Sequence, residues 1–111
     1  MGLFDFLRPK FPSITPQEAE TRIQAGAMLL DVRESVEYRS GHAPAAKLIS
    51  LGVLPRRLKE LPVEREILVI CNTGGRSSQA ATMLAKEGYN VTNVSGGMVA
   101  WQRAGLRTVR K

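Results

Sequence analysis

The chain has 111 residues, one cysteine, one histidine and a formal net charge of +6. This length is typical of a single domain with one hydrophobic core. No apolar run approaches the roughly 18 residues that a membrane-spanning helix needs, so we expect no membrane span. A single cysteine excludes an internal disulfide and an all-cysteine metal site. No secretory signal is visible, and the expectation is a soluble, cytoplasmic protein.

The positive charge is concentrated in the second part of the chain. Positions 67–111 contain six basic residues and one acidic residue, which together account for +5 of the net charge. A positive field in this region would steer small anionic ligands towards the protein. We expect no nucleic acid partner, because the basic residues are scattered and aromatic residues make up 5% of the chain, too few for surfaces on which bases stack.

Helices and strands are predicted to alternate along the chain. The expected organisation is an N-terminal extension at 1–12, one domain at 13–106 and a basic tail at 107–111. Thr15 can cap a helix that begins at Pro16. The expected helices lie at 16–26, 36–41, 53–61, 77–86 and 98–104.

Short apolar segments between these helices predict five strands. They lie at 13–14, 27–32, 47–51, 67–70 and 89–94. Alternation of this kind predicts an α/β fold, with a five-stranded parallel sheet, helices on both faces and right-handed crossovers. Trp101, in the last helix, is expected to be an anchor of the core.

The only cysteine, Cys71, lies in a tight loop between a strand and a long helix. The run Ile67-Leu68-Val69-Ile70 is typical of a strand that is buried on both faces. Cys71 therefore follows the carboxyl end of a central strand, where open α/β sheets bind their ligands. Unpaired N–H groups and the positive end of the helix dipole favour a thiolate here. The pKa of Cys71 is thus predicted to lie below the usual value of about 8.5.

The residues after Cys71 favour a reactive site over an inert core cysteine. A lone cysteine after a buried strand is most often a small hydrophobic residue. A core cysteine, however, has no need of the glycine pair Gly74-Gly75 or of Arg76 at a helix start. The glycines let successive N–H groups turn inward as an anion cradle. Arg76 adds a permanent cation with a planar set of donors.

The segment Cys71-Asn72-Thr73-Gly74-Gly75-Arg76-Ser77 resembles the active-site loop of a single-domain rhodanese, a sulfurtransferase of the thiosulfate sulfurtransferase type. The resemblance extends over roughly 14–106 and includes three further kinds of motif in the expected order. These motifs are Asp31-Val32-Arg33 with Glu37-Tyr38, Gly41-His42-Ala43-Pro44, and Gly96-Gly97-Met98-Val99-Ala100-Trp101.

The resemblance implies a rhodanese-like fold and a persulfide on Cys71 as the intermediate. The donor would be a small anionic sulfur compound such as thiosulfate, and the acceptor a thiol, a protein thiol included, or cyanide. No cofactor or metal is implied. The residues expected to bind the substrate are Asn72, Thr73, Gly74, Gly75, Arg76 and Ser77.

The sequence also suggests roles for five side chains in and around the loop. Asp31 and Arg33 border the expected pocket, and by resemblance a structural role is favoured for both. His42 is interpreted as a structural histidine, since no other member of a catalytic triad is apparent. The hydroxyls of Ser77 and Ser78 can either donate to the transferred sulfur or cap the helix.

Two alternative functions remain open at this point. Phosphatases and arsenate reductases of related shape place five residues between their cysteine and arginine, whereas four separate Cys71 from Arg76. The shorter loop favours a cradle of the size of one sulfur atom. The second alternative is a persulfide carrier that is docked on a partner protein and has little turnover of its own.

Overall fold

The computed structural model describes residues 11–110, so most of the expected extension at 1–12 lies outside the described part of the chain. Five strands form one sheet in the order β1-β5-β4-β2-β3, and every pairing is parallel. The predicted five-stranded parallel sheet is therefore confirmed. The strands are β1 (Ser13–Ile14), β2 (Met28–Asp31), β3 (Ala46–Leu48), β4 (Ile67–Ile70) and β5 (Val91–Val94).

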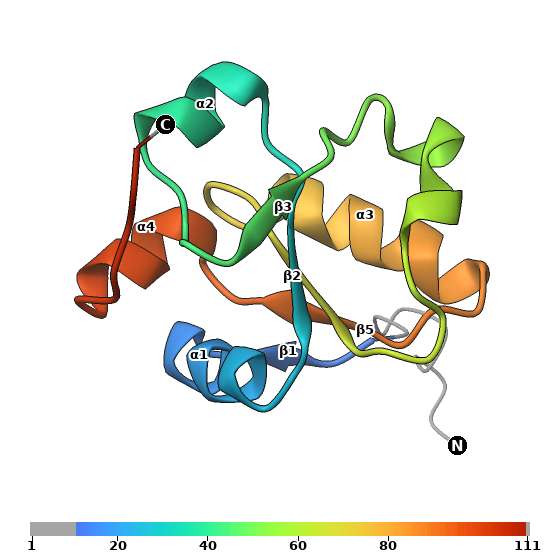
Figure 1. The fold of residues 1–111 in the computed structure, drawn as a ribbon, viewed down its shortest axis with the longest axis horizontal. Coiled ribbons are helices and arrows are strands. Elements are labelled where there is room, and N and C mark those ends of the chain that lie inside the picture. The colour runs from blue at the N-terminus through green and yellow to red at the C-terminus, as the bar shows by residue number, and fades with distance from the viewer. Residues whose placement is uncertain (1–10, 111) are drawn as a thin grey trace, which may run out of the picture.

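Helices cover both faces of this sheet, as predicted. They are α1 (Pro16–Gln24), α2 (Ser35–Ser40), α3 (Gly75–Lys86) and α4 (Gly97–Arg103). In Figure 1, α1 and α4 lie on one side of the sheet and α3 on the other. The core accordingly has two parts, one between the sheet and α3 and one between the sheet and the α1–α4 pair. Trp101 of α4 is 1% exposed and anchors the second part.

The central strand β4 contributes to both parts of the core. Ile67 and Val69 pack on the α3 side, while Leu68 and Ile70 pack on the side of α1 and α4. All four are fully buried, which explains why this strand is a continuous apolar run rather than an alternating one. Cys71 follows β4 directly, at the same edge of the sheet as Asp31 at the end of β2.

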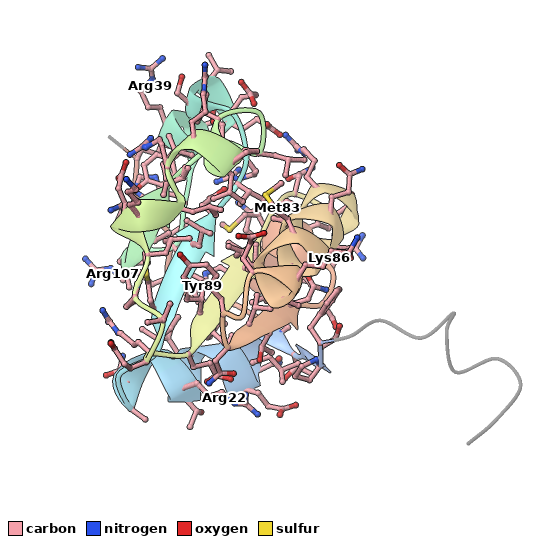
Figure 2. The ribbon with its side chains drawn as sticks, turned by 90° about the vertical axis from the view of Figure 1, so that its right-hand side faces the viewer. Arg22, Arg39, Met83, Lys86, Tyr89 and Arg107 are labelled. Carbon is pink, nitrogen blue, oxygen red and sulfur yellow. The ribbon has the colours of Figure 1, made fainter. Side chains whose placement is uncertain are left out.

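The helix predicted at 53–61 is wrong. The structure has two short 3₁₀ turns there, η2 (Leu54–Arg56) and η3 (Leu58–Glu60). Pro55 has no N–H and disfavours an α conformation at the preceding residue. The N–H groups of Arg56, Arg57, Glu60 and Leu61 each bond to the carbonyl three residues earlier. Tyr89, between these turns and α3 in Figure 2, donates its hydroxyl to the carbonyl of Leu58 at 2.8 Å.

The helix after the cysteine loop begins at Gly75, two residues earlier than predicted. The apolar pattern marks the helix only from its buried side chains onward, and glycine is a poor helix former. Gly74, with φ of 122°, is the residue at which the chain enters the helix. Arg76 therefore lies in the first turn of α3 rather than in the loop.

The C-terminal segment lies against the body of the domain. The indole N–H of Trp101 donates to the carbonyl of Arg107 at 2.9 Å. Val109 and His42 exchange two backbone hydrogen bonds of 2.9 Å in an antiparallel bridge. The part of the expected basic tail at 107–110 is thus bonded to the domain. No helix among the described residues has the length and apolar character that crossing a membrane requires.

Candidate active site

The sulfur of Cys71 lies inside the loop that joins β4 to α3. Cys71 is 1% exposed, so the surrounding loop encloses it almost completely. The N–H of Gly74 donates to Sγ at 3.0 Å, and Oγ of Ser77 lies 3.3 Å from Sγ. A thiolate can only accept hydrogen bonds, and both neighbours can donate to it.

These donors determine the acidity of Cys71. Burial raises the pKa of the thiol, but the Ser77 hydroxyl and the N–H groups of Ser77, Gly74 and Thr73 lower it by more. The net pKa lies below the ordinary thiol value, as the sequence predicts. Because the thiolate is the nucleophilic form of cysteine, a lowered pKa favours the form in which Cys71 could act as a nucleophile.

The two serines after Arg76 have different partners. Ser77 is fully buried and contacts the sulfur, while its hydroxyl also donates to the Gly74 carbonyl at 3.1 Å. Ser78 donates to the same carbonyl at 2.8 Å instead of to Sγ. The geometry therefore separates the two roles that the sequence leaves open: Ser77 faces the sulfur, and Ser78 supports the start of α3.

The start of α4 holds the other side of the cysteine loop. The N–H groups of Met98 and Val99 donate to the carbonyls of Cys71 and Asn72 at 2.8 and 3.1 Å. These carbonyls are thereby turned away from the sulfur. Gly97 has φ of 58°, and a Cβ there would lie 2.4 Å from the Cys71 carbonyl oxygen and 2.5 Å from the Asn72 carbonyl. Only glycine lets the two segments approach this closely.

Arg76 is engaged in an ion pair. Its two terminal nitrogens donate to the two carboxylate oxygens of Glu37, on α2, at 2.6 and 2.8 Å. The hydrogen bond from Arg76 lowers the pKa of Glu37 to about 2, against the opposing effect of burial and with help from the N–H of Glu34. Glu37 in turn raises the pKa of Arg76, and the nearby Cys71 adds to this effect.

Asp31 and Arg33 form a buried pair below α2. Arg33 donates through Nε and a terminal nitrogen to the Asp31 carboxylate, with the closest contact at 2.9 Å. Its terminal nitrogens also donate to the backbone carbonyls of Glu37 and Gly41. Both side chains are almost fully buried. Their hydrogen bonds position the segment that carries Glu37 and do not involve the cysteine sulfur.

His42 is held by its own neighbours. Its ring stacks on Tyr38 with centroids 3.5 Å apart, and Nδ1 lies 2.6 Å from the Tyr38 carbonyl oxygen. His42 is 4% exposed. Tyr38 also donates its hydroxyl to the carbonyl of Ala46 on β3 at 2.7 Å. These contacts are those of a structural histidine, and none of them involves Cys71.

A cleft of about 340 Å³ opens beside the cysteine loop. Its walls come from the segment around α2, from the loop and from α4. The lining residues are Arg33, Val36, Glu37, Ser40, Gly41, Asn72, Met98 and Gln102. Asn72 thus faces the cleft, whereas Thr73 and Gly75 are exposed at the tip of the loop and at the start of α3.

Two residues of the site are not identified by the sequence analysis. Glu37 is noted there only as part of a motif, and its pairing with Arg76 spans 39 positions of the chain. Gly97 is read only as part of a turn, although it fits against the cysteine loop. Glu37 and Arg76 each lie on the helix that follows one of two neighbouring strands, β2 and β4, and this placement could have suggested their pairing. For the contact of Gly97, the sequence contains no local signal.

Comparison with known proteins agrees with this geometry. The family model described as Rhodanese-like domain matches residues 15–104. The chain is 37% identical over 83 residues to a sulfurtransferase of Allochromatium vinosum, covering 74% of this chain and 78% of that protein. It is 38% identical over 74 residues to the Bacillus subtilis protein YtwF, covering 67% and 72%.

Solved structures show the same fold. A rhodanese-related protein from Thermoplasma volcanium superposes with a TM-score of 0.86 at 31% identity, over 91% of this chain and 100% of that one. The reduced CoADR-RHD protein of Bacillus anthracis gives a TM-score of 0.80 at 35% identity; the match covers 82% of this chain but spans 16% of that larger protein. From the family match, these relatives and the shared fold, we conclude that the chain belongs to the rhodanese-like domain family.

Proposed function

We propose that this protein is a sulfurtransferase that uses Cys71 to carry the transferred sulfur. The donor is an anionic sulfur compound such as thiosulfate, and the acceptor is a thiol, a protein thiol included, or cyanide. One observation carries the proposal: Sγ of Cys71 lies 3.0 Å from the N–H of Gly74, inside a loop whose donors lower its pKa. The relatives that are named as sulfurtransferases support it.

The chemistry needs one nucleophile and a set of donors. The Cys71 thiolate attacks the outer sulfur of thiosulfate, a new S–S bond forms, and the old S–S bond breaks with its electron pair leaving on sulfite. An acceptor thiolate or cyanide then attacks the terminal sulfur and releases the Cys71 thiolate. Neither leaving group must be protonated. A general acid is therefore unnecessary, and because Cys71 attacks as a thiolate no general base is needed either, in agreement with a structural His42.

The loop would stabilise the persulfide through its donors. The terminal sulfur of a persulfide carries the negative charge that Sγ carries in the free enzyme. The N–H of Gly74 already donates to Sγ, and Oγ of Ser77 lies 3.3 Å from Sγ, where it can donate to an anionic sulfur if it gives up its bond to the Gly74 carbonyl. Preorganised donors beside the sulfur act where charge develops during the reaction. We expect the four-residue spacing between Cys71 and Arg76 to suit one sulfur atom rather than a tetrahedral phosphoryl group.

Intact mass spectrometry tests the proposal directly. Treatment with thiosulfate should add the mass of one sulfur atom, and cyanide should remove it with formation of thiocyanate. Cys71→Ser should show no adduct and no turnover, while Ser78→Ala is the matched control because Ser78 does not contact the sulfur. An adduct or turnover in Cys71→Ser would refute the proposal. A stable adduct with no turnover would favour the persulfide carrier instead.

A further inference from the structure

The ion pair with Glu37 neutralises the charge of Arg76, which is the cation that an anionic donor would use. Arg76 is the one basic residue in the first turn of α3, next to the cysteine loop. Both of its terminal nitrogens are bonded to Glu37 at 2.6 and 2.8 Å. Such a two-point, charge-assisted contact is among the strongest that arginine makes. Glu37 takes two of the five N–H donors of Arg76 and neutralises its charge, so the guanidinium group attracts an anionic donor less strongly than a free arginine would.

Glu37 is also held in place by contacts other than Arg76. Its Oε1 accepts the N–H of Glu34 at 3.0 Å, at the start of α2. Its backbone carbonyl accepts a hydrogen bond from Arg33, which is fixed by the buried Asp31. The N–H of Glu34 thus positions one oxygen of the carboxylate, and Arg33 positions the part of α2 that carries it, while 32% of the Glu37 side chain is exposed. It presents a negative group on the wall of the cleft beside Asn72.

We propose that Glu37 is a specificity-determining residue: by pairing with Arg76, it makes the mouth of the Cys71 loop favour sulfur donors of low negative charge, such as an alkyl persulfide, over dianionic thiosulfate. This inference rests on the proposed sulfurtransferase function and specifies its donor class. With an alkyl persulfide R–S–SH, the Cys71 thiolate attacks the terminal sulfur. The product is Cys71–S–SH, and the electron pair of the broken bond leaves on RS⁻.

The kinetic test compares two donors that differ in charge. Glu37→Gln keeps an oxygen that can accept the N–H of Glu34 but removes the charge that neutralises Arg76. The KM for thiosulfate should fall by about tenfold, the usual size of one hydrogen bond to a charged group. The KM for hydroxyethyl persulfide should stay within about twofold of its value in the native protein. This donor carries less negative charge, so it gains less from a change of charge at a solvated group.

Two further variants separate this role from a general effect of charge or shape. Glu60→Gln removes a carboxylate that pairs with Arg57 instead of Arg76, and it should leave both KM values nearly unchanged. In the double variant Glu37→Gln/Arg76→Gln, the gain in thiosulfate affinity should disappear, because the gain depends on a free Arg76. An unchanged KM for thiosulfate in Glu37→Gln, or an equal change with both donors, would overturn the inference.

Alkylation of Cys71 gives a readout that does not depend on sulfur transfer. Iodoacetate is anionic and iodoacetamide neutral, so the ratio of their rates reports the charge at the mouth of the loop. Glu37→Gln should raise this ratio severalfold, and the double variant should return it to the native value or below. If no donor places sulfur on Cys71, the proposed function fails, and an unchanged alkylation ratio separately refutes the role of Glu37.

Discussion

The N–H of Met98 donates to the carbonyl oxygen of Cys71 at 2.8 Å, so the start of α4 fixes the backbone of the nucleophile itself. The neighbouring N–H of Val99 does the same for Asn72 at 3.1 Å. A peptide group whose carbonyl is held on one side directs its N–H to the other. The cradle around the sulfur therefore depends on a helix that follows it by some 25 positions.

Gly97→Ala should damage the site through this contact. The new Cβ would lie 2.4 Å from the carbonyl oxygen of Cys71, so the loop must shift. A shift of about 1 Å can cost on the order of a hundredfold in rate. We expect a loss of this size in kcat/KM for sulfur transfer, measured on protein whose folding has been checked by circular dichroism.

Gly105→Ala is the matched control for Gly97→Ala. Gly105 also has a positive φ, of 75°, but a Cβ there meets no atom within 4 Å. The strain of a left-handed conformation, about 1–2 kcal/mol, should lower the stability of this variant. Its activity per folded molecule should be native. Equal losses of activity in the two variants would show that backbone strain, rather than the contact with Cys71, is responsible.

Ser77→Ala should shift the reactivity of Cys71 to higher pH. The Ser77 hydroxyl is the largest of the contributions that lower the pKa of this cysteine. Its removal favours the thiol over the thiolate, so the pH at half-maximal alkylation by iodoacetamide should rise. Ser78→Ala should leave this midpoint unchanged, because Ser78 donates to the Gly74 carbonyl and not to the sulfur. Coincident profiles for the native protein and Ser77→Ala would contradict the assignment.

Asp31→Asn should destabilise the fold. The carboxylate is fully buried and accepts several hydrogen bonds from Arg33. Removing one partner leaves a buried, uncompensated charge, at a cost of about 3–5 kcal/mol. Urea unfolding should show a lower midpoint with an unchanged slope. Glu60→Gln makes the same chemical change in a solvent-exposed pair with Arg57, and it should move the midpoint little.

A longer cysteine loop should weaken sulfur transfer. One glycine inserted between Gly74 and Gly75 restores the five-residue spacing of phosphatase-like loops and adds little strain of its own. The N–H of Gly74 and the hydroxyl of Ser77 would then no longer converge on Sγ. Sulfur transfer should fall on the order of a hundredfold. Hydrolysis of aryl phosphates by the native protein, at a rate comparable with sulfur transfer, would favour the phosphatase alternative.

The sheet and the position of Cys71 were predictable because both depend on local sequence. The run from Ile67 to Ile70 marks a strand buried on two faces, and a cysteine after it must lie at the carboxyl edge. The prediction of a helix at 53–61 was wrong because the apolar spacing there also suits 3₁₀ turns. Pro55 favours the turns, since it has no N–H to donate within an α-helix. Boundaries elsewhere shifted by a few residues, as at Gly75.

The ion pair of Glu37 and Arg76 could not be predicted from the sequence, for a different reason. The two residues are on α2 and α3, and their contact depends on how each helix is placed at the edge of the sheet. Sequence reasoning gave Arg76 a charge but no partner. Likewise, the glycine motif at 96–97 indicates a turn, whereas its fit against Asn72 requires the position of α4.

The hydrogen bond from the Tyr38 hydroxyl bears on how readily two molecules can pair along the open edge of the sheet. Strand β3 is an open edge of the sheet, and such edges invite pairing with another chain. At Ala46, however, the carbonyl accepts the Tyr38 hydroxyl and the N–H donates to the carbonyl of Ala43. An approaching strand would find both groups occupied at the first residue of a strand only three residues long. Tyr38 thereby leaves fewer free backbone groups for pairing along this edge, and we expect Tyr38→Phe, which frees that acceptor, to associate more readily in light scattering at high protein concentration.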